Sequence, residues 1–204
     1  IMINKEKLLD YFKEIDSIPR ESGNENKIAN YLVKFAKDRK LEVIKDKYNN
    51  VLISKVKDFK KPIIILQGHT DMVCEKTSKS LHNFKKDPIK IINENNLLRA
   101  FDTSLGADDG VAVSYMLYLL DSDITNIECL FTVQEEIGLV GANYFDYTLL
   151  HGKYLINLDN ESDKDLIIGC AGGINLVYSK DLEYKDNNYQ AYKLSLSNLS
   201  GGHS

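Results

Sequence analysis

Three short apolar runs alternate with helical patterns along the chain, and this alternation is the feature that most constrains the fold. The runs cover residues 63–68, 127–133 and 154–158, and the first is apolar on consecutive positions, as strands buried on both faces are. An apolar segment at 110–120, GVAVSYMLYLL, lies between the first two runs and is typical of a buried helix. Strands that alternate with helices form largely parallel sheets. We therefore expect an α/β domain whose sheet is covered by helices on both faces.

Further helices and a hairpin are predicted around these runs. Apolar residues recur at helical spacing between residues 8 and 15, which predicts a helix that Pro19 ends. Ser22 and Glu25 fit a capping box, which predicts that a second helix begins there. Residues 89–100 contain two short apolar segments around a pair of asparagines, and this pattern indicates a β-hairpin.

The character of the sequence changes near residue 173. From there apolar and polar residues alternate, which predicts half-exposed strands. We expect residues 1–185 to form one domain and residues 186–204 to begin a second one. The chain ends in GGHS, and two glycines before a histidine are typical of a functional loop, so we expect this sequence to be a fragment.

Composition and charge exclude several classes of function. The net charge is −4, and no basic cluster of the kind that binds nucleic acid is present. No apolar stretch approaches the roughly 18 residues that a membrane span needs. The three cysteines form no C-x-x-C pair, and their odd number disfavours a disulfide framework, which predicts a reducing, cytoplasmic compartment. No nucleic-acid or membrane partner is expected.

Acidic and imidazole side chains stand at the ends of the predicted elements in four separate segments. They are His69 and Asp71, Asp108 and Asp109, Glu135 and Glu136, and Asp159. Each has an ordinary alternative: a histidine bonded to a local carboxylate, a helix cap, or a surface residue beyond a strand. Loops at the carboxyl ends of strands are also where α/β proteins build their sites. Four such segments together favour one shared site over four coincidences.

The residue types suggest a metal site with a neighbouring base. One imidazole and three carboxylates suit zinc, and also manganese or cobalt; the set is His69, Asp108, Glu136 and Asp159. A single catalytic zinc usually takes three protein ligands, so the larger set predicts two metal ions about 3.5–4 Å apart. Glu135 is then left beside a ligand, where a carboxylate can act as a general base toward metal-bound water.

The ordered motifs resemble those of the M20 metallopeptidases, most closely the aminoacyl-histidine dipeptidase branch (Xaa-His dipeptidase, carnosinase-like). The matching segments are IPRESGNE at 18–25, LQGHTDMVCEK at 66–76, GADDG at 106–110, FTVQEEIGLVGA at 131–142, LINLDNE at 155–161, IGCAGG at 168–173 and GGHS at 201–204. The resemblance implies a zinc-exopeptidase-like fold. Residues 1–185 would then be the N-terminal part of the catalytic domain, and 186–204 the start of a lid and dimerisation domain.

The resemblance also implies how two metal ions would be held. His69 and Asp159 would bind one ion and Glu136 the other, with Asp108 bridging both. Asp109 would follow the bridging ligand, at a peptide bond that is commonly strained in the family. Zinc is the first expectation for both ions.

The remaining implied roles concern catalysis and substrate. Asp71 would orient His69, and Glu135 would be the general base for a water that bridges the two ions and attacks the peptide carbonyl. His203 resembles a lid residue that holds the substrate carbonyl or its oxyanion. The family's homodimer would form through the lid.

One departure limits the resemblance. The family's fifth metal ligand is a histidine far downstream, and His82 and His151 lie in other positions. We therefore expect this chain to bind one metal ion firmly and to be weakly active or inactive by itself.

The predicted function is metal-dependent hydrolysis of dipeptides, with histidine at the C-terminal position. Another M20-type enzyme, a deacylase, tripeptidase or aminopeptidase with the same metal centre, is an alternative. A metal-binding fragment without catalysis is a second alternative, and Glu135→Gln would leave its function unchanged.

Overall fold

The computed structural model describes residues 3–95, 97–160, 162, 164–169, 172, 176–186 and 188–195. It divides into two compact units, Ile1–Asn160 and Glu161–Ser204, which are described separately. The predicted domain boundary after residue 185 falls inside the second unit and stays a prediction. In the second unit the described residues form no helix or strand, so the half-exposed strands predicted after residue 173 are not found there. A strand needs a partner for its backbone groups, and no described residue of this unit supplies one.

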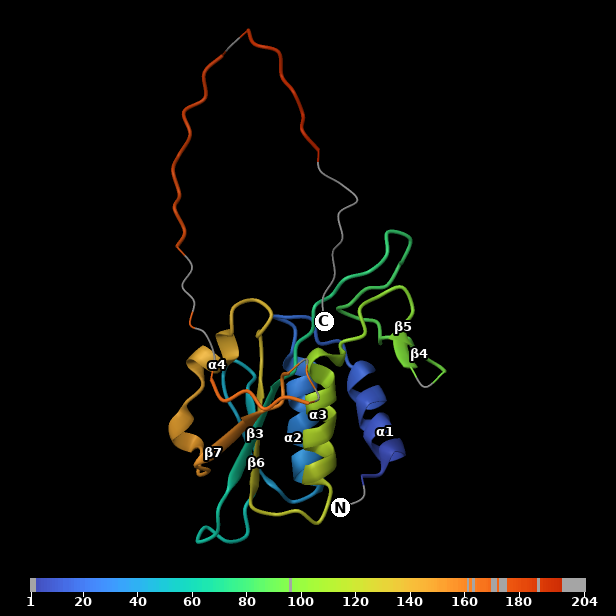
Figure 1. Cartoon of the computed structure of the whole chain (residues 1–204), viewed down its shortest axis with the longest axis vertical. Coiled ribbons are helices and arrows are strands. Elements are labelled where there is room, and N and C mark those ends of the chain that lie inside the picture. Colours follow the sequence, from blue (N-terminus) through green and yellow to red (C-terminus); the bar gives the residue numbers. More distant parts are fainter. Residues whose placement is uncertain are drawn as a thin grey trace. The chain divides into compact units, whose positions relative to one another are not determined.

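The first unit is built on a mixed five-stranded sheet in the order β1-β2-β6-β3-β7 (Figure 1). The strands are β1 Glu42–Lys45, β2 Val51–Lys55, β3 Ile64–His69, β6 Ile127–Thr132 and β7 Tyr154–Asn157. Strands β3, β6 and β7 are mutually parallel, whereas β1 and β2 are antiparallel to their neighbours. The three predicted apolar runs are therefore three adjacent parallel strands. Their carboxyl ends meet at one edge of the sheet.

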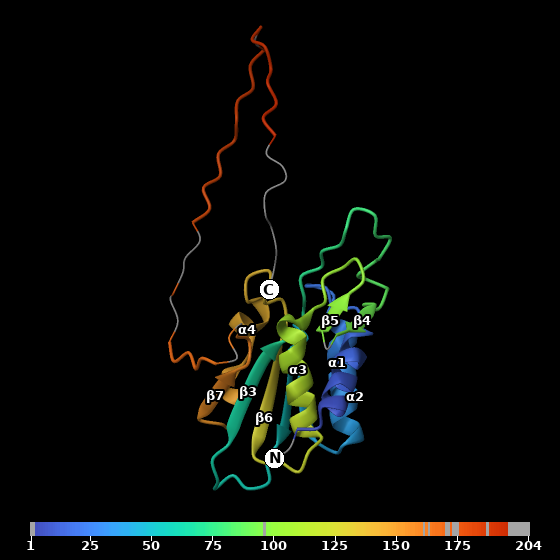
Figure 2. The same ribbon diagram turned by 45° about the vertical axis from the view of Figure 1, so that its right-hand side comes forward.

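Helices cover the two faces of this sheet unequally. The helices α1 Lys5–Asp16, α2 Asn26–Asp38 and α3 Ala107–Leu120 enclose the larger core against one face (Figure 2). The short helix α4 Val140–Tyr144 and the 3-10 helix η1 Tyr147–Leu149 border a smaller core on the other face. Strand residues alternate between these cores, as the pleat requires, with Leu66 in the larger and Ile65 in the smaller. The expected α/β fold is confirmed.

The hairpin predicted in the region 89–100 is also present, as the separate two-stranded sheet of β4 Ile91–Glu94 and β5 Leu97–Ala100. No helix within the described residues is long and apolar enough to cross a membrane.

Asp121, directly after α3, ties the three large helices together. Its carboxylate accepts hydrogen bonds from the Tyr11 hydroxyl (2.7 Å) and the Arg39 Nε (2.6 Å), and it pairs with the Lys7 ammonium (2.5 Å). Burial alone would raise the pKa of Asp121, but the hydrogen bonds from Arg39, Lys7 and Tyr11 outweigh it and hold that pKa well below its ordinary value. This carboxylate therefore stabilises the fold only while it is ionised.

We expect Asp121→Asn to lower the free energy of unfolding by about 1–2 kcal/mol at neutral pH, because charged hydrogen bonds are lost at a partly exposed site. A depressed carboxyl pKa contributes stability above the unfolded-state value, and this contribution disappears as the pH falls below about 4. The difference between wild type and variant should shrink over that range. Urea titrations at several pH values measure it, and Asp10→Asn on the exposed face of α1 is the control. A difference that stays constant down to low pH would contradict this assignment.

Candidate metal centre

His69 is at the centre of a cluster at the carboxyl ends of β3, β6 and β7. The imidazole is 1% exposed, and its Nε2 lies 3.0 Å from Oδ1 of Asp108, 3.8 Å from Oδ2 of Asp159 and 4.0 Å from Oε2 of Glu135. These three carboxylates come from the start of α3, the loop after β7 and the loop after β6. The predicted segments thus converge, because parallel strands end at the same edge of the sheet.

Asp71 supports both the imidazole and the glutamate loop. Its backbone carbonyl lies 3.0 Å from Nδ1 of His69, an arrangement that leaves Nε2 directed at the carboxylates. Its buried carboxylate accepts hydrogen bonds from the backbone N–H groups of Glu135 (3.1 Å) and Glu136 (3.3 Å), and from the hydroxyl of Ser22 (2.7 Å). Asp71 therefore fixes the position of both predicted glutamates.

The capping box predicted at Ser22 and Glu25 is wrong. Helix α2 begins at Asn26 without a side-chain cap, and Ser22 donates to Asp71 instead. The carboxylate of Glu25 is buried and accepts hydrogen bonds from the backbone N–H of Gly23 (2.9 Å) and of Gln134 (3.1 Å). Ser22 and Glu25 therefore make tertiary contacts that hold the loops of the site in place.

Asp108 and Asp109 both take part in the cluster, joined by a cis peptide bond. The sequence assigned only Asp108 as a ligand. Asp109 is almost fully buried, accepts a hydrogen bond from the backbone N–H of His69 (3.1 Å), and belongs with His69 and Asp159 to a group that could hold a metal ion. The Asp109 carboxylate lies so close to Gly68 that a Cβ at residue 68 would overlap it, and the sequence alone does not predict this contact.

Glu136 belongs to a second candidate group with His69 and Glu135. The five other predicted metal and catalytic residues therefore all lie around the imidazole of His69: Asp71, Asp108, Glu135, Glu136 and Asp159. The predicted substrate-binding residue His203 lies outside the described residues. His151 is not part of the cluster, since its ring contacts the buried carboxylate of Glu128 near the opposite end of β6 (2.7 Å).

Arg20 is a structural residue of the site that the sequence did not single out. Its buried guanidinium donates to the carbonyl oxygens of Thr70 (3.2 Å) and Gly106 (2.6 Å), and to the carboxylate of Asp16 (2.8 Å). It thereby joins the loop that follows β3 to the loop that precedes α3. A charge directly after Pro19 could have been a surface residue, so nothing local distinguished it.

The electrostatics of the cluster favour a bound cation. Burial lowers the pKa of His69, but Asp71, Asp109 and Asp159 outweigh it and raise that pKa to about 10. Burial raises the pKa of Asp109 to about 7, and burial also raises the pKa of Glu135, which the neighbouring Asp159 and Glu136 raise further. Protons on His69 and Asp109 therefore offset part of the negative charge of the cluster. A divalent cation would offset that charge instead and displace these protons.

This predicts that zinc binding releases roughly one to two protons per chain at pH 7, one from the imidazole of His69 and part of another from Asp109. Zinc affinity should then rise at least about tenfold per pH unit between about pH 6 and 8. Calorimetry in buffers of different ionisation enthalpy measures the released protons, with His82→Ala as the control. Zinc binding that is independent of pH would contradict this electrostatic picture.

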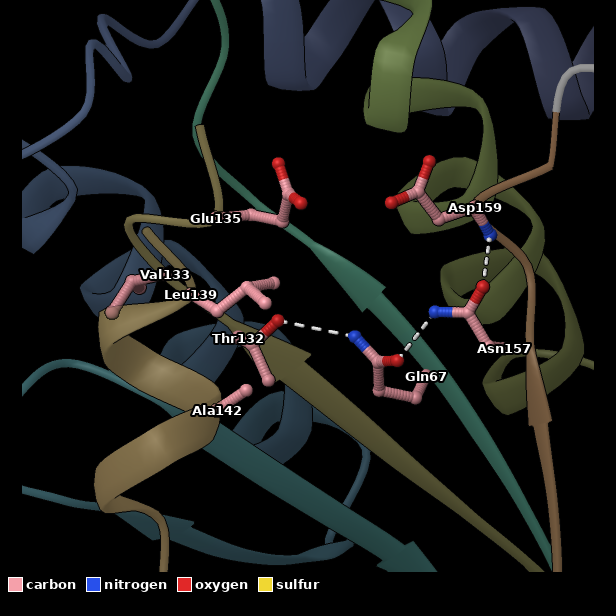
Figure 3. Close-up of a pocket in the computed structure, with 8 residues that line it drawn as sticks. All are labelled: Gln67, Thr132, Val133, Glu135, Leu139, Ala142, Asn157 and Asp159. Carbon is pink, nitrogen blue, oxygen red and sulfur yellow. Dashed lines mark hydrogen bonds between the residues drawn. The ribbon is translucent and has the colours of Figure 1, made fainter. Parts of the chain in front are cut away.

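A small cleft opens beside the cluster (Figure 3). Glu135 and Asp159 face each other across it, Val133, Leu139 and Ala142 form an apolar side, and Gln67, Thr132 and Asn157 form a neutral polar side. A small ligand in this cleft would touch the predicted base and one predicted metal ligand.

The chain matches no family model, but it is similar to several known peptidases. It is 36% identical over 211 residues to the cytosol non-specific dipeptidase of Escherichia coli, a match that covers 99% of this chain and 43% of that protein. The aminoacylhistidine dipeptidase structure of Vibrio alginolyticus superposes with a TM-score of 0.73 at 34% identity, covering 79% of this chain and 34% of that one. A tripeptidase structure from Staphylococcus aureus gives a TM-score of 0.67 at 26% identity, covering 80% and 45%.

By its fold and its sequence similarity, the chain is a homologue of peptidases. The chain has homologues among the dipeptidases of the M20 peptidase family. It spans less than half the length of each of these three relatives.

Proposed function

We propose that this chain carries the metal centre of a dipeptidase that hydrolyses peptide bonds with divalent metal ions. The observation that supports this most strongly is the convergence of three carboxylates, from three separate segments, on Nε2 of His69. A purely structural histidine needs one partner, whereas a metal ligand needs further ligands around the same point.

The donor set fits two metal ions. We assign His69 and Asp159 to one ion and Glu136 to the other, with Asp108 between them. Asp108 is preferred over Asp109 because its carboxylate lies 3.0 Å from Nε2, whereas the Asp109 carboxylate accepts the backbone N–H of His69. Zinc suits this mixture of imidazole and carboxylates, as do manganese and cobalt. The ions would polarise the peptide carbonyl and stabilise the negative charge that develops on it.

Glu135 is assigned as the general base. Its side chain is 31% exposed, borders the cleft, and lies 4.0 Å from the imidazole that would bind metal. A raised pKa suits a group that takes a proton from the attacking water and returns it to the leaving amine. Asp71 acts on His69, whose ring it orients through the contact at Nδ1.

Dipeptides, Xaa-His among them, are the proposed substrates. The relatives support a small peptide, since one is named a non-specific dipeptidase and another an aminoacylhistidine dipeptidase. The name of the Escherichia coli relative also supports a cytoplasmic location. A homodimer that forms through residues from 186 onward stays a prediction.

The test is a hydrolysis assay with the product of the complete gene on Xaa-His dipeptides, other dipeptides and tripeptides. We expect cleavage of dipeptides, loss of activity after chelation, and recovery with zinc, manganese or cobalt. Activity that survives complete metal removal would rule out the metal-dependent reaction. A preference for tripeptides would rule out the dipeptide assignment.

A further inference from the structure

A chain of hydrogen bonds between neutral side chains runs directly beside the acidic cluster (Figure 3). The Gln67 Nε2 donates to Oγ1 of Thr132 (3.1 Å), and the Asn157 Nδ2 donates to Oε1 of Gln67 (2.6 Å). The backbone N–H of Asp159 donates to Oδ1 of Asn157 (3.1 Å). The chain therefore connects β6, β3 and β7 and ends on the backbone of a proposed metal ligand.

The register of the sheet explains why these groups meet. Gln67 is opposite Asn157 in the parallel pair β3 and β7, so both amides point to the same face. Gln67 precedes His69 by two residues, and Asn157 precedes Asp159 by two. Because side chains alternate along an extended chain, the two amides form a layer next to the proposed ligands.

The chemistry of this layer suits support of a strongly acidic site. An amide donates and accepts at once, so Gln67 and Asn157 can pass the connection across three strands without adding charge. A carboxylate at either position would add repulsion to an already negative cluster, and a lysine would compete with the cation for Asp159.

Asp159 is less enclosed by the fold than His69. It lies two residues beyond the end of β7, and its side chain is 34% exposed, whereas His69 is 1% exposed and lies within β3. The hydrogen bond to Asn157 is therefore one constraint on where the Asp159 backbone lies, next to the backbone hydrogen bond from the Leu158 N–H to the Gln67 carbonyl (2.9 Å).

We propose that Gln67 and Asn157 are positioning residues that hold Asp159 in place for metal binding. The inference rests on the proposed function, because it requires that Asp159 bind a metal ion. The amides act through the Asp159 backbone, so their removal should weaken metal binding without removing a ligand.

The test measures zinc affinity of the 204-residue chain by competition with a chromophoric chelator. We expect Asn157→Leu and Gln67→Met each to weaken binding about 10–100-fold, as is typical when a group that orients a ligand is lost. The double variant should lose no more than the more damaging single variant, because both changes break one chain of contacts. The absorption spectrum of bound cobalt should also change, since it reports ligand geometry.

Matched variants separate positioning from general damage. Asn93→Leu on β4, in the separate two-stranded sheet, should leave zinc affinity unchanged. Thr132→Val removes the acceptor at the far end of this series of hydrogen bonds and should weaken zinc binding. Thr132→Ser keeps the hydroxyl and should bind zinc as the wild type does. Urea unfolding identifies any variant that does not fold, and the Thr132 pair then decides the question.

The outcomes for the metal site and for this inference are distinct. Zinc binding by the wild type with unchanged affinity in the variants, or with additive losses at Gln67 and Asn157, would overturn the positioning role and leave the metal site standing. Absence of zinc binding in the wild type would overturn the proposed function and this inference with it.

Discussion

Glu135→Gln should lower kcat for dipeptide hydrolysis about 10²–10⁴-fold, the usual contribution of a general base, while bound metal is retained. Glutamine keeps the size and the hydrogen-bonding oxygen of the side chain but cannot accept a proton at neutral pH. Because the backbone of Glu135 is fixed by Asp71, the replacement should leave the loop in place. The loss should therefore appear in kcat, with KM changed little.

The measurement compares steady-state kinetics and metal content of the wild type and Glu135→Gln, both expressed from the complete gene. Glu75→Gln is the matched control, since Glu75 is exposed and lies in the loop that follows β3 and His69. Full activity in Glu135→Gln would remove the proposed base. Lost activity together with lost metal would make Glu135 a ligand instead.

His69→Ala should weaken zinc binding at least about 100-fold. A structural zinc site with four ligands is worth about 10–16 kcal/mol, so one ligand accounts for roughly 3 kcal/mol or more. His69 belongs to both candidate metal groups, and its loss should therefore affect both. Competition with a chelator of known zinc affinity measures the change, and His82→Ala is the control for removal of a histidine.

The two adjacent aspartates give this experiment a second arm. Asp108→Asn should weaken zinc binding about as much as His69→Ala, because the Asp108 carboxylate faces Nε2. Asp109→Asn should weaken it less, since an amide oxygen can still accept the backbone N–H of His69. The reverse order of effects would make Asp109 the ligand.

The sheet and the convergence of its loops were predictable from the sequence for a specific reason. The run that became β3 is apolar on consecutive residues, as strands buried between helices are, and all three runs alternate with helical patterns, which predicts a parallel sheet. Parallel strands end at one edge, so His69, Glu135 and Asp159 could be expected to meet without knowledge of the register.

The tertiary contacts of Ser22, Glu25 and Arg20 could not be predicted from the local sequence pattern. Ser22 and Glu25 have the spacing of a capping box, but buried Asp71 and the backbone of Gln134 are better partners than a helix end. Nothing in residues 22–25 indicates that these groups, about 50 and 110 residues away, lie beside them. The same holds for Arg20, whose partners are carbonyl oxygens of distant loops.

The hydrogen-bonded amides of Gln67 and Asn157 were not predicted, because the sequence was searched for charged and nucleophilic residues and these side chains are neutral. Gln67 and Asn157 each precede a predicted ligand by two residues, and that shared offset could have been noticed. Its meaning depends on the register that places them opposite each other, which the sequence does not contain.

Zinc per chain, determined by elemental analysis after loading with excess zinc and desalting, tests the central claim most directly. The claim is that the carboxylates around Nε2 of His69 form a metal site. The account predicts at least one zinc retained per wild-type chain of 204 residues. A wild-type chain that is folded and retains no zinc would contradict it.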